Sequence, residues 1–496
     1  MPQKKLRPKT PEPEKKPELE AGTAPKLLDL QLENAKERRY PWIVLITGSA
    51  CSGRGQTVND LSEWLDTRHV RTLAWGPRES TEKDRPWLHR YWHDLPARGT
   101  GAFVFGGWYD ELFAALHEKG GNVHKHKIER ALEETHRFEQ LFVREGGLLL
   151  KVHLDLDRKV QKKRVAKYLE DPKERWRVQP EDEAELEHAK AYQKTRDALV
   201  DATSWPESPW HVVDATDEKA RSEAVAMAVL DAFVAKQKET SAKPAERKKP
   251  ATLSSTVEGT PRLSTEPTLV PLEKTEYKQL LPKLHYRLGE LQRDPRLAKR
   301  GLVVAFEGPD ASGKGGAIRR VTRGLDARFY RVVPIAAPTE LEKAHPYLWR
   351  FWEMIPPRGK MTFFDRSWYG RVLVERVEGF ATEAEWERAY DEIVGFEREL
   401  CDAGYVVAKF WLHTSKEEQL ARFEARQGNR YKNYKLTDDD LRNRKKWDDY
   451  QLAASDMITR TDSKHAPWHV VAGDDKQHAR IAVLEALIAA LERAID

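Results

Sequence analysis

The chain has 496 residues, of which 33% are charged and 40% are hydrophobic, and its net charge is +5. These fractions are typical of soluble globular domains, and no apolar run approaches the roughly 20 residues that span a bilayer, so they argue against a membrane protein. Only two cysteines are present, Cys51 and Cys401, which excludes a disulfide framework and a thiolate metal cluster. We therefore expect a cytoplasmic protein.

Residues 1–30 are the first predicted segment. They are rich in Pro, Lys and Glu and hold too little apolar surface to offset the entropy lost on ordering, which predicts a disordered tail. They also lack the apolar core of a secretory signal, so they give no indication of export.

The rest of the chain divides into two similar blocks, residues 31–235 and 271–496, separated by a Lys-, Ser-, Thr- and Pro-rich stretch at 236–270 that predicts a flexible linker. Gly48-Ser-Ala-Cys-Ser-Gly-Arg-Gly55 aligns with Gly308-Pro-Asp-Ala-Ser-Gly-Lys-Gly315 at an offset of 260 residues (308 − 48 = 260). The register continues through Trp108-Tyr109 and Trp368-Tyr369, and Pro-Trp-His-Val-Val recurs at 209 and 467. The chain is therefore a tandem duplication of a unit of somewhat over 200 residues.

Strands and helices alternate in each block. In the second block we expect strands at 302–306, 361–365, 405–412 and 468–471, amphipathic helices between them, and a last helix near 477–493. This alternation predicts an α/β fold, a mostly parallel sheet flanked by helices, with the glycine-rich segment at a strand's carboxyl end.

That glycine-rich segment, residues 308–316, has the pattern of a phosphate-binding loop. Gly308 and Gly313 permit a tight path, backbone N–H groups point inward, and Lys314 with the positive end of the next helix attracts an anion. Gly315 stands where the usual motif has the Ser or Thr that holds Mg²⁺, so another group must hold the metal.

Two carboxylates are candidates for that role. Asp310 lies inside the loop, and Asp365 ends the predicted strand at 361–365, where a hard cation would find oxygen ligands beside the phosphates. Arg366 follows and is placed to clamp a transferring phosphoryl group. The alternative is that the loop is only a turn and Asp-Arg only a surface pair.

The first block lacks these groups. It has Ala50, Arg54, Phe105 and Gly106 where the second has Asp310, Lys314, Asp365 and Arg366. Without the two carboxylates it loses its metal anchors, and arginine is a poor substitute for the compact ammonium of a loop lysine. We therefore expect the first block to keep the fold and to be catalytically inactive.

Basic residues gather around the second block's loop and further along the chain. The cluster comprises Arg319, Arg320, Arg323, Lys343, Arg358, Lys360, Arg366, Arg371, Arg422, Arg426, Arg430, Lys432, Lys435 and the run from Arg442 to Lys446. Such a density predicts a ligand more anionic than a single nucleotide.

Several motifs resemble those of the polyphosphate kinase 2 family. They are Gly-Pro-Asp-Ala-Ser-Gly-Lys-Gly-Gly from 308, Pro-Pro-Arg-Gly-Lys from 356, Asp-Arg-Ser-Trp-Tyr-Gly-Arg-Val-Leu-Val-Glu from 365 and the late Pro-Trp-His-Val-Val. The fused pair with a degraded first unit is similar to the two-domain branch of that family, the polyphosphate:AMP phosphotransferases. The resemblance implies a P-loop kinase-like fold with a helical lid, Mg²⁺ (Mn²⁺ as an alternative), and phosphoryl transfer from inorganic polyphosphate to AMP to give ADP.

The resemblance also implies site residues. The catalytic set is Asp310, Lys314, Asp365 and Arg366, with Asp310 and Asp365 holding the metal. The expected polyphosphate- and nucleotide-binding residues are Gly308, Ser312, Gly313, Gly315, Gly316, Arg358, Arg371, Glu375, Arg422, Arg426, Lys432 and Lys435. The chain departs from the family in the lid, where Asn429-Arg430 replaces an Asp-Pro and Tyr434 replaces a Trp.

Other functions remain open at this stage. ADP or GDP could be the acceptor, or the reaction could run toward polymer synthesis, since no base-reading residue stands out. An ATP-dependent kinase of a small metabolite would carry a similar loop and strand-end Asp, and a basic nucleic-acid-binding protein is the alternative from another class. We expect no nucleic-acid or membrane partner, and the sequence leaves homo-oligomerisation open.

Overall fold

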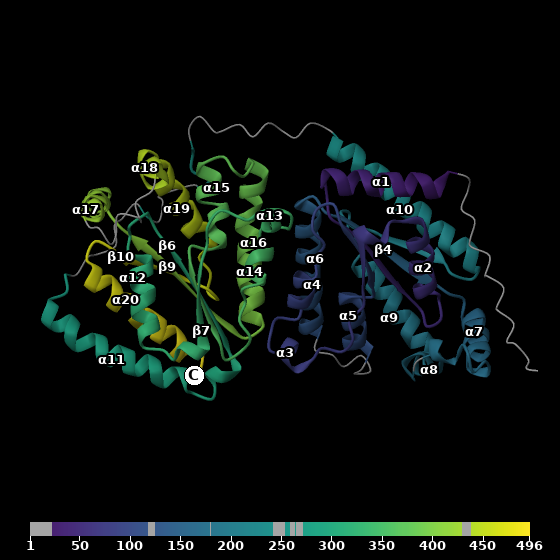
Figure 1. The fold of residues 1–496 in the computed structure, drawn as a ribbon. Helices are drawn as coiled ribbons and strands as arrows, with labels where there is room; N and C mark the ends of the chain where they lie inside the picture. Colours follow the sequence, from purple (N-terminus) through teal and green to yellow (C-terminus); the bar gives the residue numbers. More distant parts are fainter. Residues whose placement is uncertain are drawn as a thin grey trace, which may run out of the picture. The chain divides into compact units, whose positions relative to one another are not determined.

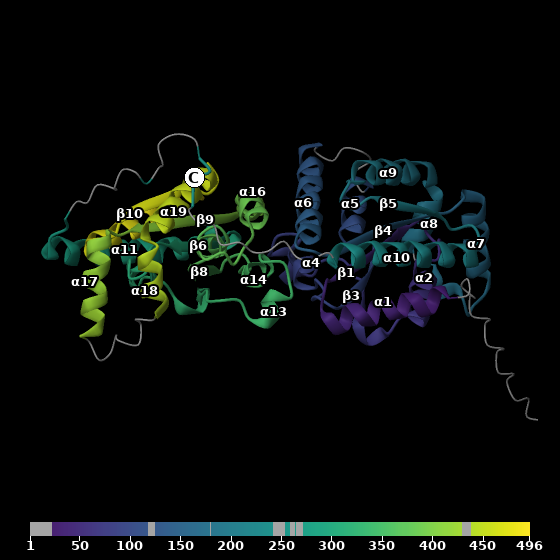
Figure 2. The same ribbon diagram turned by 90° about the horizontal axis from the view of Figure 1, so that it is seen from above.

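The computed structural model describes residues 22–117, 125–178, 180–241, 253–257, 263, 271–428 and 438–496. These residues form two compact units, one from residues up to 75 together with 96–243, the other from 76–95 together with 244–496. Each unit holds a sheet with helices on both of its faces (Figures 1 and 2). Across the described part of the chain, no helix is both long and apolar enough to cross a bilayer.

The first repeat contains five strands: β1 (Trp42–Gly48), β2 (Val70–Leu73), β3 (Gly101–Phe105), β4 (Leu148–Asp155) and β5 (Trp210–Asp214). Its α-helices are α1 (Thr23–Glu37), α2 (Arg54–Trp64), α3 (Ser80–Lys83), α4 (His89–His93), α5 (Trp108–His117), α6 (Lys125–Arg144), α7 (Arg158–Glu170), α8 (Pro180–Glu187), α9 (Ala189–Ala202) and α10 (Glu218–Ser241). Two 3₁₀ helices complete it, η1 (Thr67–His69) and η2 (Arg175–Arg177).

The second repeat also contains five strands: β6 (Gly301–Glu307), β7 (Tyr330–Pro334), β8 (Met361–Asp365), β9 (Tyr405–His413) and β10 (Trp468–Ala472). Its α-helices are α11 (Lys274–Gln292), α12 (Lys314–Arg323), α13 (Glu340–Lys343), α14 (Trp349–Trp352), α15 (Val374–Val377), α16 (Glu383–Asp402), α17 (Lys416–Gln427), α18 (Asp438–Lys445), α19 (Trp447–Thr461) and α20 (Lys476–Arg493). Its 3₁₀ helices are η3 (Leu297–Lys299), η4 (Ala327–Phe329) and η5 (Trp368–Arg371).

The two sheets have the same topology. The first has the order β2-β3-β1-β4-β5 and the second the order β7-β8-β6-β9-β10, and every pairing in both is parallel. The predicted α/β fold, tandem duplication and parallel sheets are thus confirmed. Because all strands run the same way, their carboxyl ends meet at one edge of each sheet.

The central strand of the second repeat explains why this architecture is stable. Every residue of β6 is buried, as expected for a strand covered by helices on both faces of a parallel sheet. On one face, Val304 and Phe306 pack with residues of α12 and α20, including Val321 and Leu484. Burial of such side chains supplies most of the free energy of folding.

The predicted tail and linker boundaries need correction. Helix α1 begins at Thr23, inside the predicted tail, because Leu27 on its apolar face is completely buried in the first repeat's core. Helix α10 runs on to Ser241, past the predicted start of the linker at 236. The predicted tail residues 1–21 and most of the predicted linker lie outside the described residues.

Candidate active site

The segment between β6 and α12, residues 308–313, forms a tight loop that we call the glycine loop. Gly308 has a φ of 146°, and a Cβ at this position would lie 2.6 Å from the carbonyl oxygen of Leu412, so only glycine fits. Gly313 has a φ of 108° and caps the start of α12, whose first turn contains Gly315 and Gly316. The positive end of a helix thus points into the loop.

Lys314 opens α12 and turns back over the glycine loop. Its Nζ donates hydrogen bonds to the carbonyl oxygens of Gly308 at 2.8 Å and Pro309 at 3.1 Å. Burial, reinforced by the nearby Arg366 guanidinium, lowers the pKa of this lysine. The ammonium is therefore held at the loop, where an anion would meet it.

Asp365, the last residue of β8, lies against the start of α12. A Cβ at Gly315 would stand 3.3 Å from Oδ2 of Asp365, so the missing side chain makes room for this carboxylate. A strand-end carboxylate therefore lies beside the position at which the usual motif has a hydroxyl side chain.

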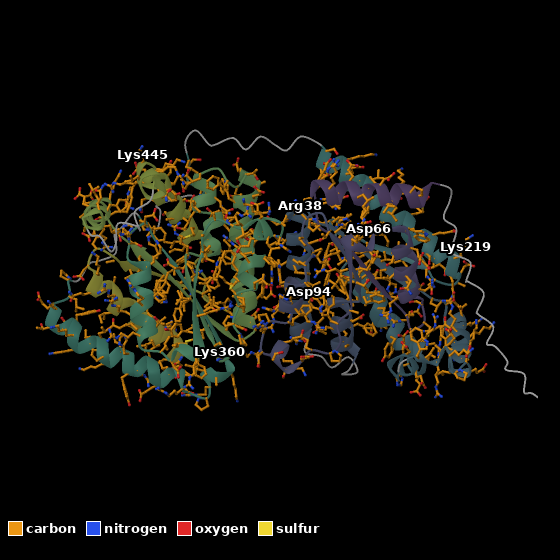
Figure 3. The ribbon with its side chains drawn as sticks, viewed as in Figure 1. Arg38, Asp66, Asp94, Lys219, Lys360 and Lys445 are labelled. Carbon is orange, nitrogen blue, oxygen red and sulfur yellow. The ribbon has the colours of Figure 1, made fainter. Side chains whose placement is uncertain are left out.

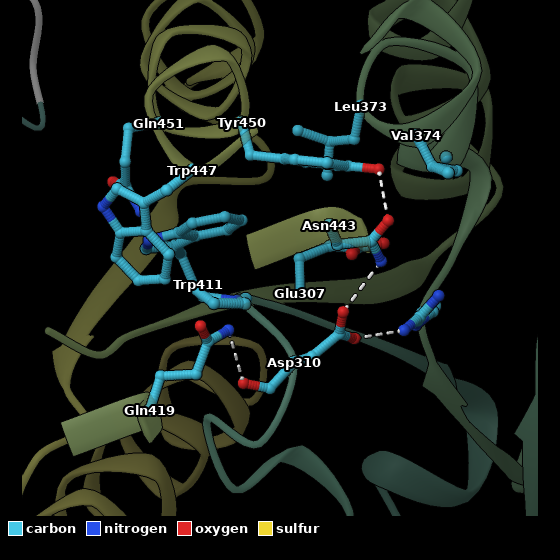
Figure 4. Close-up of a pocket in the computed structure, with 14 residues that line it drawn as sticks. Glu307, Asp310, Leu373, Val374, Trp411, Gln419, Asn443, Trp447, Tyr450 and Gln451 are labelled. Carbon is cyan, nitrogen blue, oxygen red and sulfur yellow. Dashed lines mark hydrogen bonds and ion pairs between the residues drawn. The ribbon is translucent and has the colours of Figure 1, made fainter. Parts of the chain in front are cut away.

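The carboxylate of Asp310, inside the loop, is held by two side chains from other elements. Arg366 Nη2 donates to its Oδ1 at 2.5 Å, and Asn443 Nδ2 of α18 donates to its Oδ2 at 2.8 Å (Figure 4). Burial works against ionisation, but the charges of Arg366 and Lys314 outweigh it and keep the pKa of this carboxyl below its ordinary value. These neighbours therefore favour the ionised form of Asp310.

Arg366 adopts a backbone conformation that favours glycine. Its φ is 66°, in the left-handed region, which costs a non-glycine residue about 1 to 2 kcal/mol. The counterpart in the first repeat, Gly106, has a φ of 58°. Strain of this kind persists where a side chain has a function, so the arginine is placed here at a cost in stability.

Glu307, the last residue of β6, is a buried carboxyl that the sequence interpretation missed. It is 4% exposed and accepts a hydrogen bond from Ser367 Oγ at 2.8 Å. Burial raises its pKa. Its position at the end of a predicted strand, directly before Gly308, is the signal in the sequence that marks it.

A cavity with aromatic walls opens beside the glycine loop (Figure 4). Its lining includes Trp411 of β9, Trp447 and Tyr450 of α19, and Leu373 and Val374, where α15 begins. Tyr450 Oη donates to Asn443 Oδ1 at 3.2 Å, so α19, α18 and Asp310 are joined by a chain of hydrogen bonds. Sequence patterns gave no signal for these residues, which come from separate elements.

Comparisons with known proteins agree with this arrangement. The family model for polyphosphate kinase 2 (PPK2) matches residues 12–241 and 271–495. The chain belongs to the polyphosphate kinase 2 family. A polyphosphate:AMP phosphotransferase of Pseudomonas aeruginosa is 41% identical over 470 residues, which cover 94% of each chain. An ADP-polyphosphate phosphotransferase of Rhizobium meliloti is 40% identical over 217 residues, 44% of this chain and 71% of its own.

A solved structure extends the comparison to three dimensions. A crystal structure from Pseudomonas aeruginosa PA01, assigned to polyphosphate kinase 2, superposes with a TM-score of 0.81 at 39% identity. The match covers 95% of this chain and 94% of the other. Both repeats are therefore part of the shared fold.

Not every residue expected of a polyphosphate kinase 2 site faces the glycine loop. Arg422 of α17 is buried, and its guanidinium donates to the carbonyl oxygens of Ala311 and Ser312, both at 2.9 Å. Arg164 makes the equivalent bond to the carbonyl oxygen of Cys51 in the first repeat. Arg422 therefore supports the loop in this structure, and its contact with substrate stays a prediction.

Arg358 lies at the other edge of the sheet. It precedes β8, whose amino end is opposite to the loop, and its Nη2 donates to the carbonyl oxygen of Ala403 at 3.0 Å. Lys360, two residues later, and Lys445, at the end of α18, appear at opposite ends of the second repeat in Figure 3. Arg358 therefore lies away from the glycine loop, because closeness in sequence to a strand does not say which end of it a residue occupies, and its contact with substrate stays a prediction.

The remaining predicted residues divide into three groups. Ser312 is a buried residue of the loop itself, with its Oγ 2.9 Å from where a Cβ of Gly308 would stand. Arg371 pairs with Glu375 at 3.2 Å and lies 4.3 Å over the ring of Tyr347, while Arg426 contributes to the lowered pKa of Asp310. Lys432 and Lys435 lie outside the described residues.

In the first repeat, a carboxylate from a helix is bonded to the equivalent loop. The backbone N–H of Ala50 donates to Glu185 Oε1 at 3.0 Å, and Arg196 forms an ion pair with Glu185 and donates to Ser49 Oγ at 3.2 Å. Glu185 of α8 corresponds to Asn443 of α18 at the offset of 258 residues (443 − 185 = 258). The second repeat thus has a carboxylate within its loop, that of Asp310. The first repeat has instead a carboxylate from a helix that contacts its loop, that of Glu185.

Proposed function

We propose that this protein transfers a phosphoryl group from inorganic polyphosphate to AMP, giving ADP, and that the second repeat performs the reaction. The observation that carries the proposal is the convergence of the glycine loop, Lys314, Asp310, Asp365 and Arg366 at one sheet edge, beside an aromatic cavity. The full-length similarity to polyphosphate:AMP phosphotransferases supports AMP as the acceptor.

Asp310 and Asp365 are the proposed ligands of a magnesium ion, with manganese as an alternative. Within the described residues no group of three or more His, Cys, Asp or Glu side chains forms a metal cluster. Two carboxylates are nevertheless what magnesium uses when substrate phosphates and waters complete its shell. The space that Gly315 leaves for Asp365 supports this fit. Bound magnesium would neutralise charge on the phosphates that it bridges.

The protein's own groups do the rest by position and charge. The N–H groups of the glycine loop and the start of α12 hold the donor phosphate, and Lys314 exchanges its carbonyl contacts for phosphate oxygens. Arg366, released from Asp310, stabilises the charge on the transferring phosphoryl group. The acceptor phosphate of AMP is already ionised at neutral pH, so no general base is needed.

The aromatic cavity is the proposed site of the acceptor's base. Trp411, Trp447 and Tyr450 offer flat apolar surfaces, and Gln451 and Asn443 offer amide groups for hydrogen bonds. The cavity measures about 80 Å³, below the roughly 300 Å³ of the smallest ligand pockets. The base would therefore occupy this cavity only if its walls move apart.

One assay tests the proposal. Purified full-length protein is incubated with polyphosphate and Mg²⁺, without ATP, against a panel of AMP, GMP, ADP and GDP. We expect ADP to form fastest from AMP. Product formed only from ADP or GDP would mean that a nucleoside diphosphate, and not AMP, is the acceptor. Transfer that requires ATP would identify an ordinary metabolite kinase and overturn the proposal.

A further inference from the structure

Residues 254–257, between the two repeats, make specific contacts with the second unit. We call this segment the strap. Ser255 Oγ donates to Asp456 Oδ1 at 2.7 Å, and Thr256 donates to Asp456 Oδ2 from its backbone N at 3.0 Å and from its Oγ1 at 3.2 Å. Arg376 Nη2 donates to the carbonyl oxygen of Ser254 at 3.1 Å. The strap thus donates hydrogen bonds to the carboxylate of Asp456 and accepts one from the guanidinium of Arg376.

Those two side chains form a buried ion pair. Arg376 Nη1 lies 2.9 Å from Asp456 Oδ2, and the side chains are 0% and 1% exposed. Arg376 also donates to Tyr390 Oη at 2.8 Å, and its guanidinium lies 4.3 Å over the ring of Trp386. Burying a charge is costly unless hydrogen bonds compensate it, and the strap supplies three such bonds to Asp456.

The ion pair joins the two helices that form walls of the aromatic cavity. Arg376 lies on α15, two residues after the cavity residue Val374. Asp456 lies on α19, which also carries the cavity residues Trp447 and Tyr450. The separation of these two helices therefore depends on a network that the strap completes.

The first repeat has no equivalent of this pair. Leu116 stands at the position of Arg376 (376 − 116 = 260), and Ala198 at the position of Asp456 (456 − 198 = 258). The network is therefore absent from the repeat whose loop is filled by its own carboxylate. It belongs to the repeat that we propose to be catalytic.

We propose that the strap is a positioning element for the acceptor cavity, so that the segment between the repeats takes part in substrate binding. Its hydrogen bonds hold α15 against α19 and thereby set the width of the cavity. Loss of the strap's hydrogen bonds makes both helices more mobile and weakens acceptor binding, but it leaves the residues of the glycine loop unchanged. The assignment of AMP to this cavity rests on the proposed function, whereas the helix-holding role does not.

The test is a double variant, Ser255→Ala with Thr256→Val, in the full-length protein. It removes two hydroxyl donors from Asp456 and the acceptor of Arg460 Nη1, and it leaves the backbone bond to Asp456. Ser254→Ala is the matched control, because Ser254 contributes its carbonyl oxygen to the network. Hydrogen exchange of α15 and α19 is measured together with kcat and KM for AMP.

We expect faster exchange in both helices and a KM for AMP raised about tenfold, with kcat within about twofold of the parent, since lost bonds to a buried charge are costly. The control should match the parent. Unchanged exchange, or a fall in kcat with KM unchanged, would overturn the positioning role. A parent protein that does not use AMP would overturn the proposed function, and the exchange result would still decide the role of the strap.

Asp456→Asn provides a second variant. It keeps the side chain's shape but removes the charge that faces Arg376. We expect a larger change in exchange and KM, in the same direction. Exchange equal to that of the parent in this variant would contradict the network on which the proposal rests.

Discussion

Both repeats bury a lysine of the fourth strand against a glutamate of a neighbouring helix. Lys151 lies 2.8 Å from Glu139 in the first repeat, and Lys409 lies 2.8 Å from Glu397 in the second. In each repeat the lysine also donates to a helix-end carbonyl, that of Thr203 or Thr461. This duplicated network contacts neither glycine loop, so its presence in both repeats indicates that it serves the fold.

The carboxyl edge of the sheet differs between the repeats. The second repeat has an acidic loop residue, Asp310, facing an amide, Asn443, whereas the first has Ala50 facing the carboxylate of Glu185. The residues exchanged here all lie at this edge. The difference teaches that the scaffold tolerates the loss of site chemistry, provided that the buried charges of the core stay paired.

The largest expected effect is that of Asp365→Asn, which removes one of the two carboxylates that the first repeat lacks. We expect the rate of ADP formation from AMP to fall about 100-fold or more, because a charged group at the reacting phosphates is lost. Asparagine has nearly the same volume, so the melting temperature should change little. A rate within tenfold of the parent would contradict the role of Asp365.

Arg366→Gly, which installs the residue of the first repeat, separates function from stability. We expect turnover to fall about 100-fold, while the relieved left-handed strain offsets the lost ion pair with Asp310. Arg366→Ala is the control, since it loses the same ion pair and keeps the strain. Chemical denaturation should show the glycine variant to be more stable than the alanine variant by about 1 kcal/mol. Equal stabilities would refute the strain argument.

Glu185→Asn, which installs the residue of the second repeat, should reopen the first repeat's loop. The N–H of Ala50 and the guanidinium of Arg196 would then be available to an anion. Calorimetric titration with tripolyphosphate should reveal one more binding site per chain than in the parent. The rate of ADP formation from AMP should stay within about twofold of the parent's rate. Glu187→Asn, on the same helix, is the control. An unchanged stoichiometry would show that Glu185 does not close the loop.

The smallest expected effect is that of Arg54→Ala in the first repeat. Arg54 stands at the position of Lys314 but faces Asp110 at 3.8 Å, beside a loop already filled by Glu185. We expect kcat and KM for AMP to stay within about twofold of the parent. A strong loss would mean that the first repeat takes part in catalysis.

Much of the fold followed from local patterns, and the misses have physical causes. The apolar runs at 302–306 and 361–365 predicted β6 and β8, because strands buried on both faces read as continuous hydrophobic stretches. β7 was missed, since Tyr330–Pro334 is an edge strand with exposed residues and a terminal proline. α1 was missed because its buried face is narrow and its flanks are highly charged.

The candidate site was only partly predictable. Gly308, Lys314, Asp310 and Asp365 could be named because a turn, a helix start and a strand end are local features of the chain. The role of Arg422 could not, because its carbonyl partners lie 111 and 110 residues away in sequence. Basic character alone does not distinguish a substrate contact from a buried support.

The sequence by itself determined the duplication, the parallel α/β architecture and the set of charged groups that only the second repeat carries, because these depend on periodicity and on residue identity. Only the tertiary structure decided that Glu185 fills the first loop, that Arg358 lies at the far edge, and that the strap completes a buried ion pair. These depend on which distant side chains meet in a low-dielectric interior, where each charge must find a partner.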